Sequence, residues 1–303
     1  MPGVSIVREA GGDAAGFDAA LSAVRFFDEY RTTVHYDGDD LTVASTGYDG
    51  YPVRTVETEH GCVVLEGYLY DVDDADAHLA DVAEWVATDD RTALRSWVRD
   101  RDGDFLVVVV DETEETATVV PDALGRLPLY HAEIDGATVV SRELKLIREL
   151  AEIRDEPVGV DDLAVAQSLL FGYRLGTRTL FDSVDRLPPA ATLSVGEDRE
   201  VSRLFRHDFG ATVYDHRSPE ENAAQLADLF ETACENRTAL PGGTVLALSG
   251  GLDSRAVAGA FEATGVDFTA ATFDRPDGSA SDEVRAAASV ADALDVDWQQ
   301  YVA

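Results

Sequence analysis

The stretch Leu246-Ala247-Leu248-Ser249-Gly250-Gly251-Leu252-Asp253-Ser254 decides the fold of the C-terminal part of this chain. An apolar run leads into serine and two glycines, and an acid-led helical pattern follows. This is the order of a buried strand, a glycine turn and the start of a helix. Glycine lets the backbone come close to a ligand, and the positive end of the helix attracts an anion. The stretch therefore predicts a phosphate-binding loop.

The segments around this loop alternate between strand and helix. Strands are predicted over 244–248 and 268–273, with a further apolar run starting at Trp298. Helices are predicted over 220–237, 253–264 and 282–294. Alternation of this kind predicts a parallel sheet. We expect an α/β parallel-sheet domain over residues 218–303.

The first two thirds of the chain have a different texture, in which short β-branched runs are separated by polar turns and by helical patterns. The predicted strands are 32–36, 41–45, 62–65, 105–111, 116–120, 137–141 and 191–195, and the predicted helices are 75–87, 91–99, 142–153 and 161–171. We expect an α+β domain over residues 1–210.

The chain is strongly acidic, with 59 acidic and 24 basic residues and a formal net charge of −35 over 303 residues. Such a field repels nucleic acid and anionic membranes, so neither is expected as a partner. An acidic surface that is poor in lysine stays hydrated in concentrated salt, and it resembles the surfaces of proteins from salt-loving archaea. The two cysteines form no metal or disulfide pattern, and no signal peptide or spanning segment is recognisable. The cytoplasm is the expected location.

Two other interpretations of the glycine turn fail on missing residues. A Walker loop requires a lysine for the phosphates, and no lysine follows Lys145. A hydrolase nucleophile elbow requires a later histidine, and none follows His216. The remaining pattern, Ser-Gly-Gly-x-Asp-Ser, resembles the pyrophosphate loop of the N-type ATP pyrophosphatases, which cleave ATP between its α- and β-phosphates.

The expected nucleotide site follows from this loop. Pyrophosphate is expected at Ser249, Gly250, Gly251, Asp253 and Ser254, with Asp253 also holding Mg²⁺ because hard cations prefer oxygen ligands. Leu248 and Thr272, at two adjacent strand ends, are candidates for the adenine side, and a core role is the alternative for each. Asp282 and Glu283 contact the metal or cap a helix. The expected cofactors are ATP and Mg²⁺.

Other segments resemble the asparagine synthetase family. Residues 271–273 and 281–284 resemble its second strand and acid-led helix, 122–130 its glycine–Pro-Leu-Tyr signature, and 181–190 the end of its glutaminase domain. The resemblance implies an Ntn-like, class II glutamine amidotransferase-like sandwich. An adenine nucleotide α-hydrolase-like domain is expected to follow it, and to be incomplete where this chain stops.

Two departures from the family concern glutamine hydrolysis. Glutamine-dependent members carry a cysteine after the initiator methionine, and its α-amine is the base for its own thiol. Pro2 stands at this place and has no thiol. Glu66 stands where the family has an asparagine that stabilises the oxyanion, and a carboxylate there opposes negative charge. No catalytic residue is therefore expected in the first domain, and glutaminase activity is expected to be absent.

The resemblance implies an ATP-dependent amide ligase. It would activate a carboxylate, aspartate or a similar acid, as an acyl-adenylate with release of pyrophosphate, and ammonia or an amine would then displace AMP. Intramolecular amide formation of the β-lactam synthetase type is the alternative enzyme, and a non-catalytic nucleotide-binding or interaction protein is the alternative of a different class. The expected partners are a small carboxylate and a nitrogen donor, with homo-oligomerisation left open.

Overall fold

The computed structural model describes residues 2–12, 15–210, 212–214, 216–240, 242–279 and 281–302. The chain divides into two compact units, Met1–His207 and Asp208–Ala303, called here the N-terminal and C-terminal units. Each unit has apolar clusters of its own. None of the helices in these ranges combines the length and apolar content needed to cross a bilayer.

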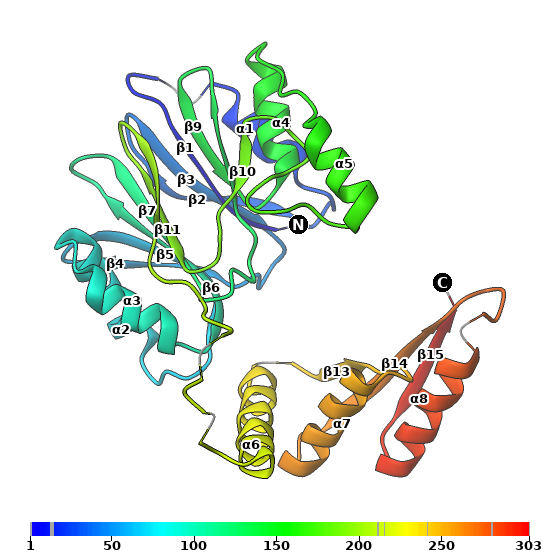
Figure 1. Cartoon of the computed structure of the whole chain (residues 1–303). Helices are drawn as coiled ribbons and strands as arrows, with labels where there is room; N and C mark the ends of the chain where they lie inside the picture. Colours follow the sequence, from blue (N-terminus) through cyan, green and yellow to red (C-terminus); the bar gives the residue numbers. More distant parts are fainter. Residues whose placement is uncertain are drawn as a thin grey trace. The chain divides into compact units, whose positions relative to one another are not determined.

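Two six-stranded sheets form the centre of the N-terminal unit, with strand orders β10-β8-β9-β1-β3-β2 and β12-β11-β7-β6-β5-β4 (Figure 1). All described pairings within them are antiparallel. The first sheet consists of β1 (Gly3–Arg8), β2 (Arg31–Asp37), β3 (Leu41–Gly47), β8 (Tyr130–Ile134), β9 (Ala137–Ser141) and β10 (Val184–Arg186). The second consists of β4 (Val53–Thr58), β5 (Gly61–Leu69), β6 (Gly103–Asp111), β7 (Thr116–Pro121), β11 (Ala191–Val195) and β12 (Arg199–Arg203).

The two sheets pack face to face, and helices cover their outer faces. One apolar cluster joins the sheets, a second packs α1 (Phe17–Ala23) and α4 (Leu144–Ile153) on the first sheet, and a third packs α2 (Ala75–Ala87) and α3 (Arg91–Asp100) on the second. This helix–sheet–sheet–helix order confirms the predicted α+β sandwich.

The sequence of β6 shows why the layers form. Its run from Phe105 to Val110 is buried throughout. Leu106 and Val108 point into the cluster between the sheets, whereas Phe105 and Val107 join the cluster beneath α2 and α3. Because side chains alternate across a strand, an uninterrupted apolar run requires cover on both faces.

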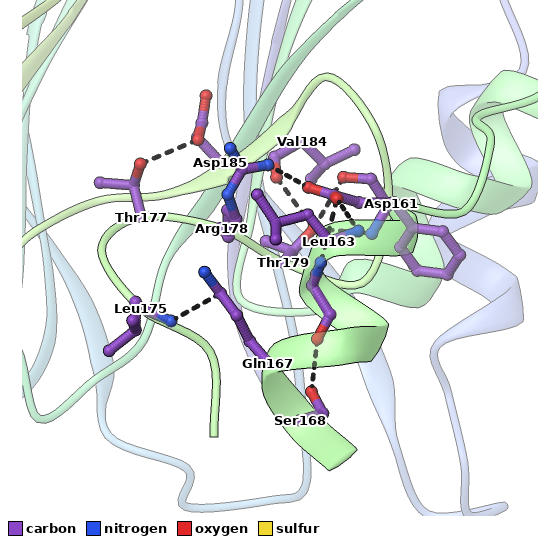
Figure 2. Close-up of polar contacts among 12 residues, drawn as sticks. Asp161, Leu163, Gln167, Ser168, Leu175, Thr177, Arg178, Thr179, Val184 and Asp185 are labelled. Atoms are coloured by element: carbon purple, nitrogen blue, oxygen red, sulfur yellow. Dashed lines mark hydrogen bonds and ion pairs between the residues drawn. The ribbon is translucent and has the colours of Figure 1, made fainter. Parts of the chain in front are cut away.

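An N-cap and an ion pair fix the start of α5 (Asp162–Phe171) in the N-terminal unit (Figure 2). Asp161 caps the helix by accepting hydrogen bonds from two backbone N–H groups of its first turn, and it forms an ion pair with Arg178. Further along, the backbone N–H of Leu175 donates to Gln167 Oε1 at 3.0 Å. The segment that follows the helix is therefore fastened back onto it.

The C-terminal unit contains a three-stranded parallel sheet in the order β13 (Thr244–Ala247), β14 (Phe268–Asp274), β15 (Trp298–Val302). The unit begins with α6 (Pro219–Thr238), which opens with a capping box between Ser218 and Glu221. The crossover helices α7 (Leu252–Thr264) and α8 (Ser281–Leu294) supply alanines to the apolar cluster on one face of the sheet. The predicted α/β parallel sheet is confirmed.

Some elements differ from those predicted. Strands β1, β4, β8, β10 and β12 and helix α1 are absent from the sequence predictions. Three of these strands, β4, β10 and β12, lie at sheet edges and mix charged residues with few apolar ones, so pairing with a neighbour rather than an apolar alternation forms them. The helix predicted over 142–153 begins at Leu144 instead, and Arg142 lies before it with its side chain buried.

Candidate functional site

The predicted phosphate loop joins β13 to α7 in the C-terminal unit. Leu248 extends the strand, since its N–H donates to the carbonyl of Ala271 at 2.9 Å. Gly251 then occupies the N-cap position of α7 with an extended backbone and no side-chain cap. Within the part of the chain that the structure describes, the N-cap residue thus places no side chain on the first N–H groups of the helix, which suits the binding of an anion there.

The two loop serines lie against each other. Their hydroxyl oxygens are 3.0 Å apart, and the backbone N–H of Ser249 donates to Ser254 Oγ, also at 3.0 Å. The Ser249 hydroxyl in turn accepts from the N–H of Gly251 at 3.2 Å. The two predicted hydroxyl donors thus lie next to each other and stabilise the loop by hydrogen bonds within it.

The start of α8 closes one side of this loop. A Cβ on Gly250 would lie 3.1 Å from the Ala286 Cβ and 3.2 Å from the Glu283 Cα, so a larger residue would not fit without displacement. This contact brings the acid-led first turn of α8 next to the glycine turn. Asp253 is exposed in the first turn of α7 and has no hydrogen bond or ion pair to any residue that the structure describes.

The two candidates for the adenine side, Leu248 and Thr272, are buried and joined by a hydrogen bond. The Thr272 hydroxyl donates to the carbonyl of Leu248 at 2.8 Å and accepts from the indole Nε1 of Trp298 at 2.8 Å. Their exposed fractions are 2% and 4%. These contacts suit core positions, and the adenine role of both residues stays a prediction.

A cavity of about 580 Å³ in this unit lies away from the loop. It is lined at the amino ends of the strands by residues such as Thr244, Phe268 and Asp297. The phosphate loop follows the carboxyl end of β13, where parallel sheets bind ligands. The cavity is therefore at the wrong edge of the sheet for the predicted nucleotide.

In the N-terminal unit, Glu66 lies in the layer between the two sheets with no exposed surface. Its carboxylate pairs with the guanidinium of Arg142, which is itself 5% exposed. It also accepts hydrogen bonds from the Tyr51 hydroxyl at 2.5 Å and from the backbone N–H of Val4 at 2.8 Å. The carboxylate thus fastens the beginning of β1 to the second sheet.

Pro2 directly precedes this network. The Tyr51 hydroxyl lies 3.5 Å from the carbonyl of Pro2, and Gly3 has φ of +148°. A Cβ on Gly3 would lie 2.4 Å from the Arg142 Cγ and 2.9 Å from the Glu66 Oε1. The buried ion pair therefore fills the space beside Gly3, directly after Pro2.

Burial and the hydrogen-bonding partners act in opposite directions on the pKa of Glu66. Burial raises the pKa of Glu66, and Arg142, Tyr51 and the N–H of Val4 oppose that rise by stabilising the carboxylate. Burial and the neighbouring carboxylate also raise the pKa of Tyr51, which keeps its hydroxyl as a proton donor.

The sequence pointed to Glu66 but not to its two side-chain partners, Arg142 and Tyr51. In the sequence alone Glu66 is an unpaired charge, whereas Arg142 neutralises it from a position 76 residues away. One signal was available, because a glutamate directly after the apolar run 62–65 of a strand requires a buried partner. Nothing in the local sequence distinguishes Arg142 from the other arginines as that partner.

Comparison with known families matches both units. The glutamine amidotransferase domain family matches residues 52–206, which is more than half of the chain. The asparagine synthase family matches residues 225–303. This chain belongs to the glutamine amidotransferase domain family, of the asparagine synthetase-like type. The predicted family is confirmed, and both families are enzymatic.

Two solved structures are similar to this chain at 13% sequence identity and a TM-score of 0.39. One is glutamine phosphoribosylpyrophosphate amidotransferase from B. subtilis complexed with ADP and GMP, matched over 99% of this chain and 65% of that one. The other is an allosteric regulatory enzyme of purine biosynthesis, matched over 100% of this chain and 80% of that one. The chain thus spans slightly less than two thirds of the first of them. Comparison with curated proteins finds no match.

Proposed function

We propose that this asparagine synthetase-like protein is an ATP-dependent amide ligase. A substrate carboxylate attacks the α-phosphorus of ATP, pyrophosphate leaves, and ammonia or an amine then displaces AMP from the acyl carbon. The observation that carries the proposal is the joined pair of serine hydroxyls, Ser249 and Ser254, at the uncapped start of α7 in a segment matched by the asparagine synthase family.

The loop residues would act by position and charge. The serine hydroxyls and the first N–H groups of α7 can donate to pyrophosphate oxygens in exchange for their contacts within the loop. Asp253 suits Mg²⁺, because its carboxylate is exposed beside these donors and has no other partner among the described residues. When bound, Mg²⁺ neutralises charge on the leaving pyrophosphate. The catalytic contribution of this chain is then mainly orientation.

Glutamine hydrolysis is excluded from the proposed reaction. Pro2 has no thiol, and the carboxylate of Glu66, held by Arg142, offers no donor to an oxyanion. We therefore propose free ammonia or an amine as the nitrogen source. Release of glutamate from glutamine by the purified chain would contradict this part of the proposal.

Exchange of radioactive pyrophosphate into ATP tests the ligase. Because the net charge is −35, the assay is run at high salt to screen repulsion within the protein. Exchange that depends on one carboxylic acid from a panel including aspartate is the expected result. Binding of Mg²⁺-ATP without exchange for any acid would refute the ligase and favour a nucleotide-binding protein.

Calorimetric titration with Mg²⁺-ATP tests the loop separately. Asp253→Asn removes the carboxylate proposed for Mg²⁺ and should weaken binding by about tenfold or more. Asp267→Asn is the matched control, since it removes an exposed carboxylate of the same unit at the cavity on the opposite sheet edge. Equal affinities for the two variants would show that the loop assignment is wrong.

A further inference from the structure

A serine, a histidine and a threonine form a hydrogen-bonded relay in the N-terminal unit, independent of the nucleotide loop. Ser45 Oγ lies 2.8 Å from His35 Nε2, and His35 Nδ1 lies 2.9 Å from Thr55 Oγ1. The three residues come from β2, β3 and β4, so the imidazole bridges the edges of both sheets. A hydroxyl, a base and a third group that orients the base are the parts of an activated nucleophile.

A β-bulge places the histidine in this relay. Val34 pairs with Ala44 and Tyr36 pairs with Val43, which leaves His35 as the extra residue of β2 without a partner in the ladder. A bulge of this kind redirects a side chain. Here it directs the imidazole toward Ser45.

The relay opens into a cavity of about 530 Å³. His35 and Ser45 line it together with the rings of Tyr48 and Tyr51, whose centroids lie 5.4 Å apart at an interplanar angle of 73°. Ser45 is only 6% exposed, so its hydroxyl is shielded from bulk water and faces a space large enough for a small molecule.

Charge at the cavity favours some ligands over others. Glu29 and Asp49 contribute two carboxylates to its lining, whereas Arg31 contributes one guanidinium that already donates to the carbonyls of Asp28 and Tyr30. In a protein of net charge −35, this lining disfavours anions. Neutral or cationic molecules with an aromatic or apolar part suit it best.

We propose that Ser45 is a base-activated nucleophile that accepts acyl groups from small neutral or cationic esters, with His35 as its general base. Ser45 Oγ attacks the ester carbonyl, its proton passes to His35 Nε2 and then to the departing alcohol, and the bond from the carbonyl carbon to that alcohol breaks. The tautomer with the proton on Nδ1 leaves Nε2 free to accept. Thr55 is a positioning residue, because in this tautomer its hydroxyl accepts from Nδ1 and holds the imidazole in place.

The condition of the imidazole agrees with this role. Burial lowers the pKa of His35 below the ordinary 6.5, so the ring is neutral and able to accept a proton at pH 7. Ser5 and Ser141 lack such a base, because their buried hydroxyls lie 2.9 Å apart and, among the described residues, each has only the other as its side-chain partner.

Acetylation by p-nitrophenyl acetate tests the proposal on the full chain at pH 7. The expected result is release of p-nitrophenol with formation of one acetylated residue, located at Ser45 by peptide mass spectrometry. Ser5 and Ser141 should remain unmodified in the same digest. Acetyl groups found only on other residues, or none at all, would overturn the proposal without any variant being needed.

Variants then separate the roles. His35→Gln should slow acetylation of Ser45 by about a hundredfold or more, the size of a general-base contribution. Thr55→Val should slow it less, and Thr55→Ser, which keeps the hydroxyl, should restore it. Ser96→Ala, which removes an exposed hydroxyl on α3, is the control and should leave the rate unchanged. A wild-type rate in His35→Gln would overturn the role of the histidine as base.

Discussion

The buried pair of Glu66 and Arg142 gives a prediction whose size follows from its contacts. Arg142→Met removes the guanidinium that pairs with Glu66 and the Nε–H that donates to the carbonyl of Pro128 at 2.7 Å. Among the described residues, Glu66 then keeps only the Tyr51 hydroxyl and the N–H of Val4 as hydrogen-bond donors, in a place with no exposed surface. Leaving such a carboxylate without its cation costs about 3–5 kcal/mol.

The double variant Glu66→Leu/Arg142→Met tests the physical reason. It removes both charges, and replacement of a buried ion pair by apolar side chains is often close to neutral. We therefore expect the double variant to be more stable than Arg142→Met alone, with a coupling energy of at least about 2 kcal/mol.

Urea unfolding of the full chain measures these differences. Trp85 and Trp97 belong to the N-terminal unit and report its transition by fluorescence. Ser96→Ala, at an exposed position on α3, serves as the control for substitution as such. If Arg142→Met cost less than about 1 kcal/mol, or if the two single effects simply added in the double variant, the pair would not be the fastening described for β1.

Three further predictions concern stability. His131 is 4% exposed, and burial lowers its pKa from 6.5 to about 4. As the pH falls from 6.5 to about 4, the unfolded chain binds a proton at this residue and the folded chain does not, so the free energy of unfolding should fall by about 3 kcal/mol. A His131→Leu variant with the same acid sensitivity in thermal melts would contradict this prediction. Asp161→Ala should lower the free energy of unfolding in urea by about 1–2 kcal/mol, because it removes the cap of α5 and the partner of Arg178. Asp161→Asn can still cap the helix and should lose less stability, so equal losses would argue against the cap. Gly250→Val should lower the free energy of unfolding by about 1–3 kcal/mol and weaken Mg²⁺-ATP binding, because the new side chain meets Ala286 and Glu283 of α8. An unchanged melting temperature and an unchanged affinity would show that the loop is not packed as described.

Local pattern was enough to predict the C-terminal unit. Apolar strand runs, the glycine turn and helix caps recur there within a few residues of one another, so the predicted alternation of strands and helices matches β13 to α8 closely. The hydroxyls of the loop serines, Ser249 and Ser254, lie 3.0 Å apart, and their role in binding pyrophosphate stays a prediction.

The N-terminal unit was predicted less completely, because its contacts are long-range. The edge strand β4 pairs with β5, and its two valines, Val53 and Val56, are three positions apart, so no apolar alternation marks it as a strand. The partner of Glu66 lies 76 residues away, and its identity required the register of β9 against β1.

The sequence by itself determined the family and the two kinds of fold, because each depends on residue order over short distances. The phosphate loop, which has the same local origin, stays a prediction. The tertiary structure alone decided that Arg142 neutralises Glu66, that Leu248 and Thr272 are buried against each other, and that a bulge turns His35 toward Ser45. The reason is physical. The free energy of a buried charge or hydroxyl depends on which groups surround it, and strands from distant parts of the chain supply those groups.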